Sequence, residues 1–161
     1  VDCGDDTGNT ECDLAKYYDG SKTAAWKDEY GYYYSLNAAL VGQVGNIKPE
    51  TDAAQDVCPN GWRLPTKNEY YAIWMLARGS GTNEMAFWAI QEAPYYFYLA
   101  GGVRGGRLIY SESLGRYWSS TIDKTGAGTG LWFNYVPETG IGSGGVGVGA
   151  YAGRSVRCVA R

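Results

Sequence analysis

The side chains that usually perform acid–base chemistry are sparse in this chain. Histidine, the common general base of serine and cysteine hydrolases, does not occur among its 161 residues. Adjacent carboxylates occur at Asp5–Asp6 and Asp28–Glu29, and a pair of acids is what a glycosidase-type site requires. These pairs are sequence neighbours in polar surroundings, which favours a solvated surface over a catalytic dyad. We therefore expect a protein that binds and is not an enzyme.

A group of oxygen-bearing side chains surrounds the first two cysteines. Its members are Asp2, Asp5, Asp6, Asn9, Glu11 and Asp13. Hard oxygen ligands at this density could hold calcium, but the alternating Asp-x-Asp-x-Asp-Gly pattern of a calcium loop is missing. We expect an ordinary acidic turn and no cofactor, with bound calcium as the alternative.

The cysteines favour disulfide bonds in an exported protein. They are Cys3, Cys12, Cys58 and Cys158, and four cysteines permit three pairings among which the sequence alone does not choose. The short separation of Cys3 and Cys12 makes a local bridge easy, and such a bridge would leave the other two cysteines to close a long loop. Zinc is the rival interpretation, but no two cysteines have the short spacing of zinc sites and no histidine completes the ligand set.

Aromatic and arginine side chains of the C-terminal half form the candidate ligand-binding surface. Strand alternation in the run 131–135 places Trp132 and Asn134 on one face, and the polar asparagine suggests that this face is exposed. Rigid amphipathic side chains of this kind anchor a ligand at a low cost in conformational entropy. The full candidate set is Tyr95, Tyr96, Arg104, Arg107, Tyr110, Arg116, Trp132, Asn134 and Tyr151.

The clearest predicted element is a helix that begins at Lys67. Thr66-x-x-Glu69 is a capping-box pattern, and Arg78 followed by Gly79 supplies the C-terminal charge and the stop. The apolar residues between them have the i, i+3, i+4, i+7 spacing of an amphipathic helix. They are Tyr70, Ile73, Trp74 and Ala77.

A second helix is expected over residues 84–92, with Asn83 as its N-cap. Its apolar face would carry Met85, Trp88 and Ala89. Nearer the start of the chain, Tyr30–Tyr34 predicts a strand that runs into a short helix over 36–41.

Residues 95–161 have the pattern of short antiparallel strands and hairpins. The runs that predict strands are Tyr95–Leu99, Leu108–Tyr110, Tyr117–Thr121, Leu131–Val136 and Arg154–Val159. The glycine-rich segments 101–106 and 140–149 are expected to be loops. In the last run, alternation directs Cys158 toward the core. The elements together predict an α+β fold in which two helices accompany a strand-rich, loop-rich C-terminal half.

Composition limits the classes of function. A chain of 161 residues fits one domain, and we expect residues 1–161 to form a single one. The net charge of −3 and the scattered lysines and arginines argue against nucleic-acid binding. No apolar run reaches the length of about 18 residues that a membrane span needs, and no leader is visible at the start.

Three motifs occur in a recognisable order along the chain. They are Cys58-Pro59-x-Gly61-Trp62-Arg63-Leu64-Pro65-Thr66-x-x-Glu69, Tyr117-Trp118-Ser119-Ser120-Thr121 and Ser155-Val156-Arg157-Cys158-Val159. In order and spacing they resemble the Fibrobacter succinogenes major paralogous (FISUMP) domain. The resemblance implies a C-type-lectin-like α+β fold on exported bacterial proteins, with Cys58 bonded to Cys158. It also implies that the chain starts after the first strand that the family usually has.

Two consequences of the resemblance concern individual residues. Trp62, Trp74 and Trp118 lie within the segments that define the fold, so we expect them to be structural. Calcium-dependent sugar-binding lectins of the wider fold use a Glu-Pro-Asn or Gln-Pro-Asp loop and a Trp-Asn-Asp strand. The nearest stretches here, Ala93-Pro94-Tyr95 and Trp132-Phe133-Asn134, lack the carboxylates, so a metal-bridged sugar site is not indicated.

We therefore expect a non-catalytic recognition module, extracellular or at the cell surface, that binds a protein or a glycan through the aromatic-rich loops and strands of its C-terminal half. One alternative is a variable receptor-binding protein of a diversity-generating retroelement, a class with the same fold whose C-terminal half is randomised at Tyr, Asn, Ser and Gly positions. Another is a structural module of an adhesin or pilus tip. Neither nucleic acid nor membrane insertion is expected, and the sequence does not indicate the ligand or the oligomeric state.

Overall fold

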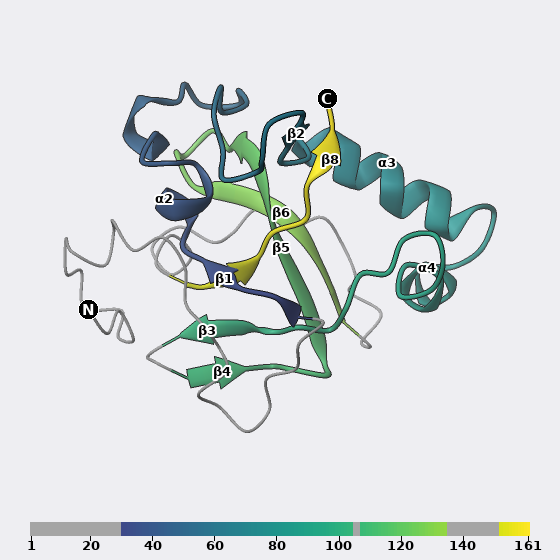
Figure 1. The fold of residues 1–161 in the computed structure, drawn as a ribbon. Helices are drawn as coiled ribbons and strands as arrows, with labels where there is room; N and C mark the ends of the chain where they lie inside the picture. Colours follow the sequence, from purple (N-terminus) through teal and green to yellow (C-terminus); the bar gives the residue numbers. More distant parts are fainter. Residues whose placement is uncertain (1–29, 105–106, 135–151) are drawn as a thin grey trace.

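A computed structural model of the protein describes residues 30–104, 107–134 and 152–161, and of Arg107 it describes only the backbone. Within these residues the fold is α+β and is organised by a four-stranded sheet (Figure 1). The strands follow the order β1 (Tyr33–Tyr34), β7 (Arg154–Ser155), β5 (Leu114–Ile122), β6 (Gly128–Asn134). Strand β7 is antiparallel to β1 and parallel to β5, and β5 and β6 form an antiparallel pair. The sheet thus joins segments from both ends of the described chain.

Two smaller sheets flank the central one. Strand β2 (Trp62–Arg63) pairs with β8 (Val159–Ala160), and β3 (Gly102–Arg104) pairs with β4 (Arg107–Ile109). The helices are α2 (Leu36–Ala39), the 3₁₀ turn η3 (Val44–Asn46), α3 (Lys67–Arg78) and α4 (Asn83–Ala89). None of the described helices has the length and apolar character that crossing a bilayer requires.

Helix α3 begins and ends where the sequence predicts. Thr66 Oγ1 accepts from the Glu69 backbone N–H at 3.1 Å, and the Thr66 backbone N–H donates to Glu69 Oε2 at 2.8 Å, which completes the capping box. Tyr70 and Trp74 are buried, and Ile73 and Ala77 pack against the same core. The predicted helix and its apolar face are confirmed.

Helix α4 buries a different face from the one expected. Its N-cap is Thr82, whose hydroxyl accepts from the Met85 backbone N–H at 3.3 Å, and not Asn83. Ala86 and Phe87 are buried, whereas Met85 and Trp88 are exposed, so the expected face was wrong. Because both sides of this short helix carry large apolar residues, spacing alone does not select one. The choice is made by Phe133 of β6, whose ring centroid lies 6.0 Å from that of Phe87.

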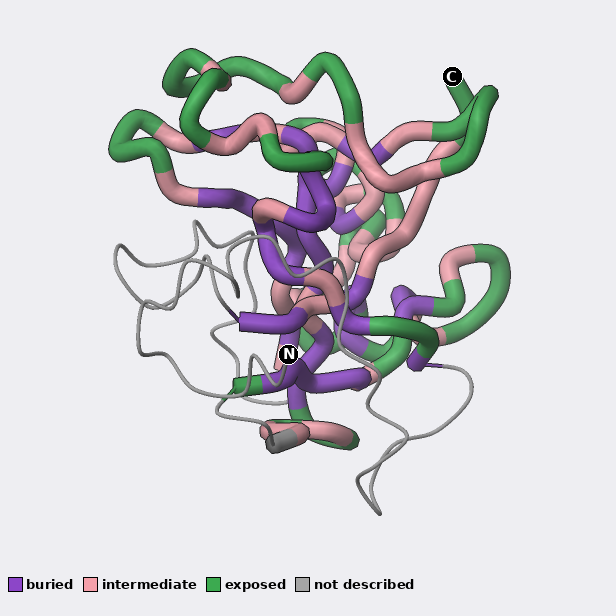
Figure 2. Tube along the Cα trace, turned by 60° about the vertical axis from the view of Figure 1, so that its left-hand side comes forward, coloured by how far each residue is buried: buried purple, intermediate pink, exposed green. Residues whose placement is uncertain are grey.

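The two faces of the central sheet are covered unequally. On the inner face, Tyr117, Leu131 and Phe133 pack against α3 and α4. On the opposite, outer face, Trp118 packs against Leu36 of α2 and neighbouring residues at one end of the sheet. Buried stretches lie in the middle of the molecule and exposed ones in the peripheral loops (Figure 2).

The C-terminal runs contain the predicted strands with three exceptions. The run 154–159 is not one strand, because β7 ends at Ser155, residues 156–158 are not in a strand, and β8 pairs with β2 in a different sheet. Residues 95–99 do not form a strand, because the chain turns there: the Tyr95 and Tyr96 backbone N–H groups both donate to Glu92 O. Residues 102–104, expected to be loop, form β3. A Cβ at Gly102 would lie 2.8 Å from Gly153 O, so this glycine allows two strands to approach closely and does not mark a loop. Residues 140–149 lie outside the described part.

A disulfide joins Cys58 to Cys158, as the resemblance implies, across 100 residues of sequence and with the Cα atoms 5.9 Å apart. It fastens the turn before β2 to the segment before β8. Cys58 packs against the cluster around Trp118, and Cys158 is half-buried. Because these two cysteines are bonded to each other, they are not zinc ligands. Cys3 and Cys12 lie outside the described residues.

The three tryptophans expected to be structural differ in burial. Trp74 and Trp118 are buried, but Trp62 is 47% exposed, so that prediction was wrong for Trp62. Strand β2 has two residues and pairs only with the short β8 in the described part of the chain, so the Trp62 side chain is covered only in part. The backbone of Trp62 is still held, since its carbonyl accepts from Arg161 Nε at 3.1 Å.

Candidate functional site

The outer face of the central sheet carries several of the candidate residues side by side. Alternation along β6 buries Leu131 and Phe133 and leaves Trp132 and Asn134 partly exposed, as the sequence predicts. Arg116 of β5 lies directly opposite Trp132, so their side chains share this face. The Arg116 guanidinium carbon lies 5.2 Å from the ring centroid of Tyr110. Strands β5 and β6 thus bring Arg116 and Trp132 of the predicted surface together.

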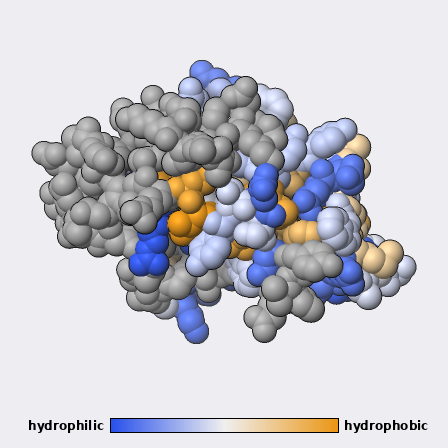
Figure 3. All heavy atoms as spheres, turned by 90° about the horizontal axis from the view of Figure 1, so that it is seen from below, coloured by the Kyte–Doolittle hydropathy of each residue, from blue (hydrophilic) through white to orange (hydrophobic). Residues whose placement is uncertain are grey.

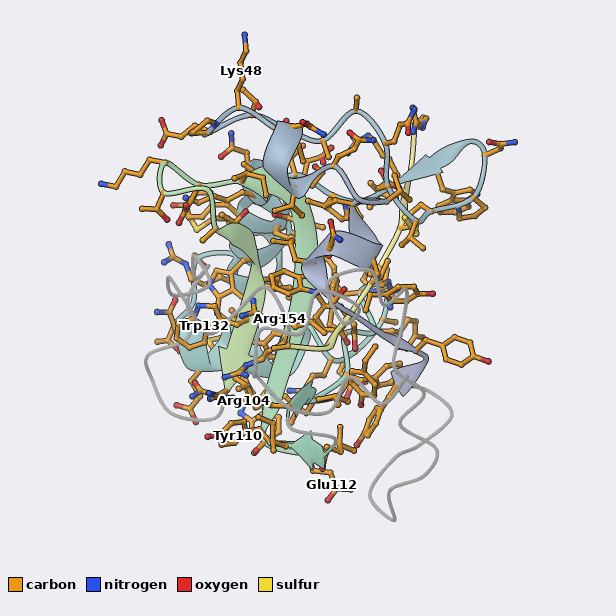
Figure 4. All side chains as sticks on the ribbon, turned by 90° about the vertical axis from the view of Figure 1, so that its left-hand side faces the viewer. Lys48, Arg104, Tyr110, Glu112, Trp132 and Arg154 are labelled. Atoms are coloured by element: carbon orange, nitrogen blue, oxygen red, sulfur yellow. A yellow bond between two sulfur atoms is a disulfide. The ribbon has the colours of Figure 1, made fainter. Side chains whose placement is uncertain are left out.

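Arg154 of β7 extends this surface, although it was not among the sequence-based candidates. Its guanidinium carbon lies 4.0 Å from the ring centroid of the buried Trp118. The indole is fixed in turn, because Trp118 Nε1 donates to Tyr34 O at 2.7 Å. Figure 4 shows Arg154 beside Trp132, with Arg104 and Tyr110 below them. We call Arg104, Tyr110, Arg116, Trp132, Asn134 and Arg154 the outer-face cluster.

Positive charge accumulates in this cluster. Burial, and then the charge of Arg116, lowers the pKa of Arg154 to about 10. Burial also lowers the pKa of Arg116, with a further contribution from the charge of Arg104. Both guanidinium groups remain protonated at neutral pH. Within the described residues, neither Arg116 nor Arg154 forms an ion pair with a carboxylate.

Two buried polar atoms of the cluster have no hydrogen-bond partner in the described part of the chain. They are Arg154 Nε, a donor, and Asn134 Oδ1, an acceptor. A buried polar atom without a partner costs free energy, typically about 1–3 kcal/mol. A ligand that offered both an acceptor and a donor here would remove that cost.

Comparison with known proteins does not assign the protein to a family. No family model, curated protein or solved structure matches the chain.

Four candidates are not part of the outer-face cluster. Tyr95 packs against the inner-face core. Tyr96 belongs to the same segment, where its carbonyl accepts from Arg157 Nη1 at 2.6 Å. The Arg157 guanidinium carbon lies 5.0 Å from the ring centroid of Phe97. The side chain of Arg107 and the whole of Tyr151 lie outside the described part. The structure thus separates the first two tyrosines from the surface to which the sequence assigned them.

Sequence reasoning missed Arg154 because β7 is short and its neighbours are far away in the chain. The residue pairs with Tyr34, and Ser155 next to it pairs with Tyr33 and with Tyr117. A signal was available in the sequence. Strand alternation that directs Cys158 inward also places Arg154, four residues earlier, on the inward face. An arginine at an inward position of an apolar strand indicates either a buried ion pair or a binding role.

A polar pocket of about 240 Å³ lies elsewhere, at the start of α3, and Asp52 and Asp123 are among the residues that line it. The Asp52 carboxylate accepts from Thr121 Oγ1 at 2.5 Å, and Asp123 accepts from the backbone N–H groups of Thr125 and Ala127. These carboxylates hold loops in place. The described residues contain no group of three or more His, Cys, Asp or Glu side chains arranged to hold a metal ion. The acidic residues 2–13 considered for calcium are not described.

The end of the molecule that carries β3 and β4 has both hydrophilic and apolar residues on its surface (Figure 3). Seen from below, hydrophilic residues lie directly beside apolar ones (Figure 3). Tyr110, which follows β4, is 58% exposed although it lies next to Arg116. Aromatic and charged groups in contact at a surface are typical of the residues that dominate binding at protein interfaces.

Proposed function

We propose that the protein is a non-catalytic recognition module that binds a protein or a glycan through the outer-face cluster. The observation that carries the proposal is a pair of arginines, Arg116 and Arg154, each of which lies over an aromatic ring. They lie beside the partly exposed Trp132 and form no ion pair with a carboxylate within the described residues. Gathering positive charges in a partly buried place opposes folding through repulsion and desolvation, whereas binding gains anchors and hydrogen-bond donors from it.

We also propose that the fold is C-type-lectin-like and that the protein is exported. The support is the pairing of an early strand with a late one, the β5–β6 hairpin with two helices on one face, and the bond between Cys58 and Cys158. Disulfides persist in oxidising compartments, which favours an extracellular or cell-surface location.

A variable receptor-binding protein is the second candidate. Tyr110, Trp132 and Asn134 are partly or largely exposed and lie on or beside strands whose inner faces form the core, so they can change without loss of the fold. A near-identical template repeat beside the coding sequence would support this candidate, and its absence would count against it.

The experiment is an array of glycans and cell-surface proteins, probed with the wild-type protein with and without a calcium chelator. Tyr110→Ala is compared with Tyr71→Ala, because Tyr71 of α3 is 55% exposed and lies on a different element. We expect at least one ligand whose signal survives the chelator, falls with Tyr110→Ala and is unchanged with Tyr71→Ala. Absence of any ligand, or equal effects of the two substitutions, would contradict the proposal.

A further inference from the structure

Arg154 and Arg116 are each held against an aromatic ring before any ligand arrives. A guanidinium over the face of an aromatic ring is attracted by the electron density of that face. Arg154 lies on Trp118, which is fully buried and fixed by its hydrogen bond to Tyr34 O. Arg116 lies over Tyr110 from the neighbouring strand. Little side-chain freedom is therefore lost when these groups bind.

Within the described residues, the charges of Arg116 and Arg154 are not neutralised by a carboxylate. The two guanidinium groups repel each other, and burial weakens the hydration of both. Arg154 Nε–H in addition has no acceptor in the described chain. A bound anion would offset both the repulsion and the missing hydrogen bond.

The shape of the donors favours a carboxylate. Guanidinium groups match the planar carboxylate through two parallel hydrogen bonds, which are among the stronger hydrogen bonds in proteins. Asn134 adds a buried acceptor on the same face, and a polypeptide carries backbone N–H donors close to its acidic side chains. The exposed ring of Tyr110 and the partly exposed ring of Trp132 are of the types that dominate protein–protein contacts.

We infer that Arg116 and Arg154 bind a side-chain carboxylate of an acidic polypeptide segment. This inference depends on the proposed function and specifies its ligand. The carboxylate bridges the two guanidinium edges, Asn134 accepts from the segment's backbone, and Trp132 packs against its side chains.

The probe for this inference is a fluorescein-labelled peptide of seven glutamates, followed by fluorescence anisotropy at low ionic strength. A peptide of seven glutamines controls for charge, and an oligogalacturonate with as many carboxylates controls for the polypeptide backbone. We expect binding of the glutamate peptide alone, and a Kd that rises with added salt because the contacts are ionic.

Substitutions locate the contact. Arg116→Gln and Arg154→Gln should each weaken binding of the glutamate peptide about tenfold or more, and Arg154→Lys should also weaken it, because lysine lacks the planar fork. Lys48→Gln removes one positive charge at the opposite end of the molecule (Figure 4) and should change the Kd less than twofold. If Arg154→Gln fails to fold, as judged by thermal melting, Arg116→Gln and Arg116→Lys provide the same test.

The outcomes separate this inference from the proposed function. If the array ligand still depends on Tyr110 while the glutamate peptide does not bind, the carboxylate inference is overturned and the recognition function stands. If oligogalacturonate binds more tightly with the same dependence on Arg116, the ligand is an acidic glycan and the polypeptide assignment is overturned. If Lys48→Gln weakens binding as much as Arg116→Gln, the attraction is non-specific and the site is refuted.

Discussion

Glu69 links β2 to α3, and neutralising it should cost a defined amount of stability. Its Oε2 accepts from the Thr66 backbone N–H at 2.8 Å and from Arg63 Nη1 at 2.6 Å, while Oε1 accepts from Arg63 Nη2 at 2.5 Å. The hydrogen bond from Arg63 is the main reason that the pKa of Glu69 falls from 4.5 to about 2. Because the pKa is lower in the folded state, the stabilisation is complete above pH 4.5 and disappears as the pH falls toward 2.

The magnitude follows from this pKa difference and from exposure. A fall from 4.5 to about 2 corresponds to at most about 3.4 kcal/mol. The side chains of Arg63 and Glu69 are 32% and 39% exposed, so solvent screening reduces the contribution to about 1–2 kcal/mol. Glu69→Gln keeps a group that can accept the capping hydrogen bond and removes the charge. We expect it to lower the free energy of unfolding by about 1–2 kcal/mol at pH 7.

Urea unfolding at a series of pH values between 2 and 7 measures this difference. Glu84→Gln is the matched control, because Glu84 also lies in the first turn of a helix but forms no ion pair within the described residues. It should cost about 0.5 kcal/mol or less. A Glu69→Gln deficit that stays constant down to pH 2, or one that equals the Glu84→Gln deficit at pH 7, would refute the reasoning.

Three further predictions concern the frame that carries the outer-face cluster. Replacing both Cys58 and Cys158 with serine removes a cross-link between residues 100 positions apart, and should lower the free energy of unfolding by about 4–5 kcal/mol in guanidinium titrations. An unchanged unfolding midpoint would contradict the role of this bond. A Cβ at Gly130 would collide with Tyr117 O, so Gly130→Ala should lower the free energy of unfolding by about 3 kcal/mol or more. A Cβ at Gly45 meets no other atom, so Gly45→Ala should lower it by less than about 1 kcal/mol. Phe133→Ala should cost about 3–5 kcal/mol and Trp132→Ala less than about 1.5 kcal/mol, and a reversed order would place the wrong face of β6 in the core.

Local signals account for the parts of the fold that the sequence predicted well. Helix α3 was predictable because its start, its apolar face and its end are encoded within fourteen consecutive residues, from Thr66 to Gly79. The alternation of Leu131, Trp132, Phe133 and Asn134 is equally local, so the exposed face of β6 was also predictable. Strand β6 supplied two members of the outer-face cluster, Trp132 and Asn134.

Long-range pairing accounts for what the sequence did not predict. The position of Arg154 depends on the pairing of β7 with β1, whose residues are more than a hundred positions away. The position of Tyr96 away from the cluster depends on the hydrogen bond that its carbonyl accepts from Arg157, which no pattern near residue 96 encodes. The buried face of α4 depends on Phe133, because the helix itself has large apolar residues on both sides.

The claim that the outer face of the sheet is the contact surface is tested most directly with one ligand recovered from the array. Isothermal titration calorimetry compares its Kd for Trp132→Ala of β6 with its Kd for Trp88→Ala, whose indole is 52% exposed on α4. We predict that Trp132→Ala weakens binding about tenfold or more and that Trp88→Ala leaves the Kd within about twofold of the wild type. Tight binding by Trp132→Ala together with weak binding by Trp88→Ala would contradict the claim.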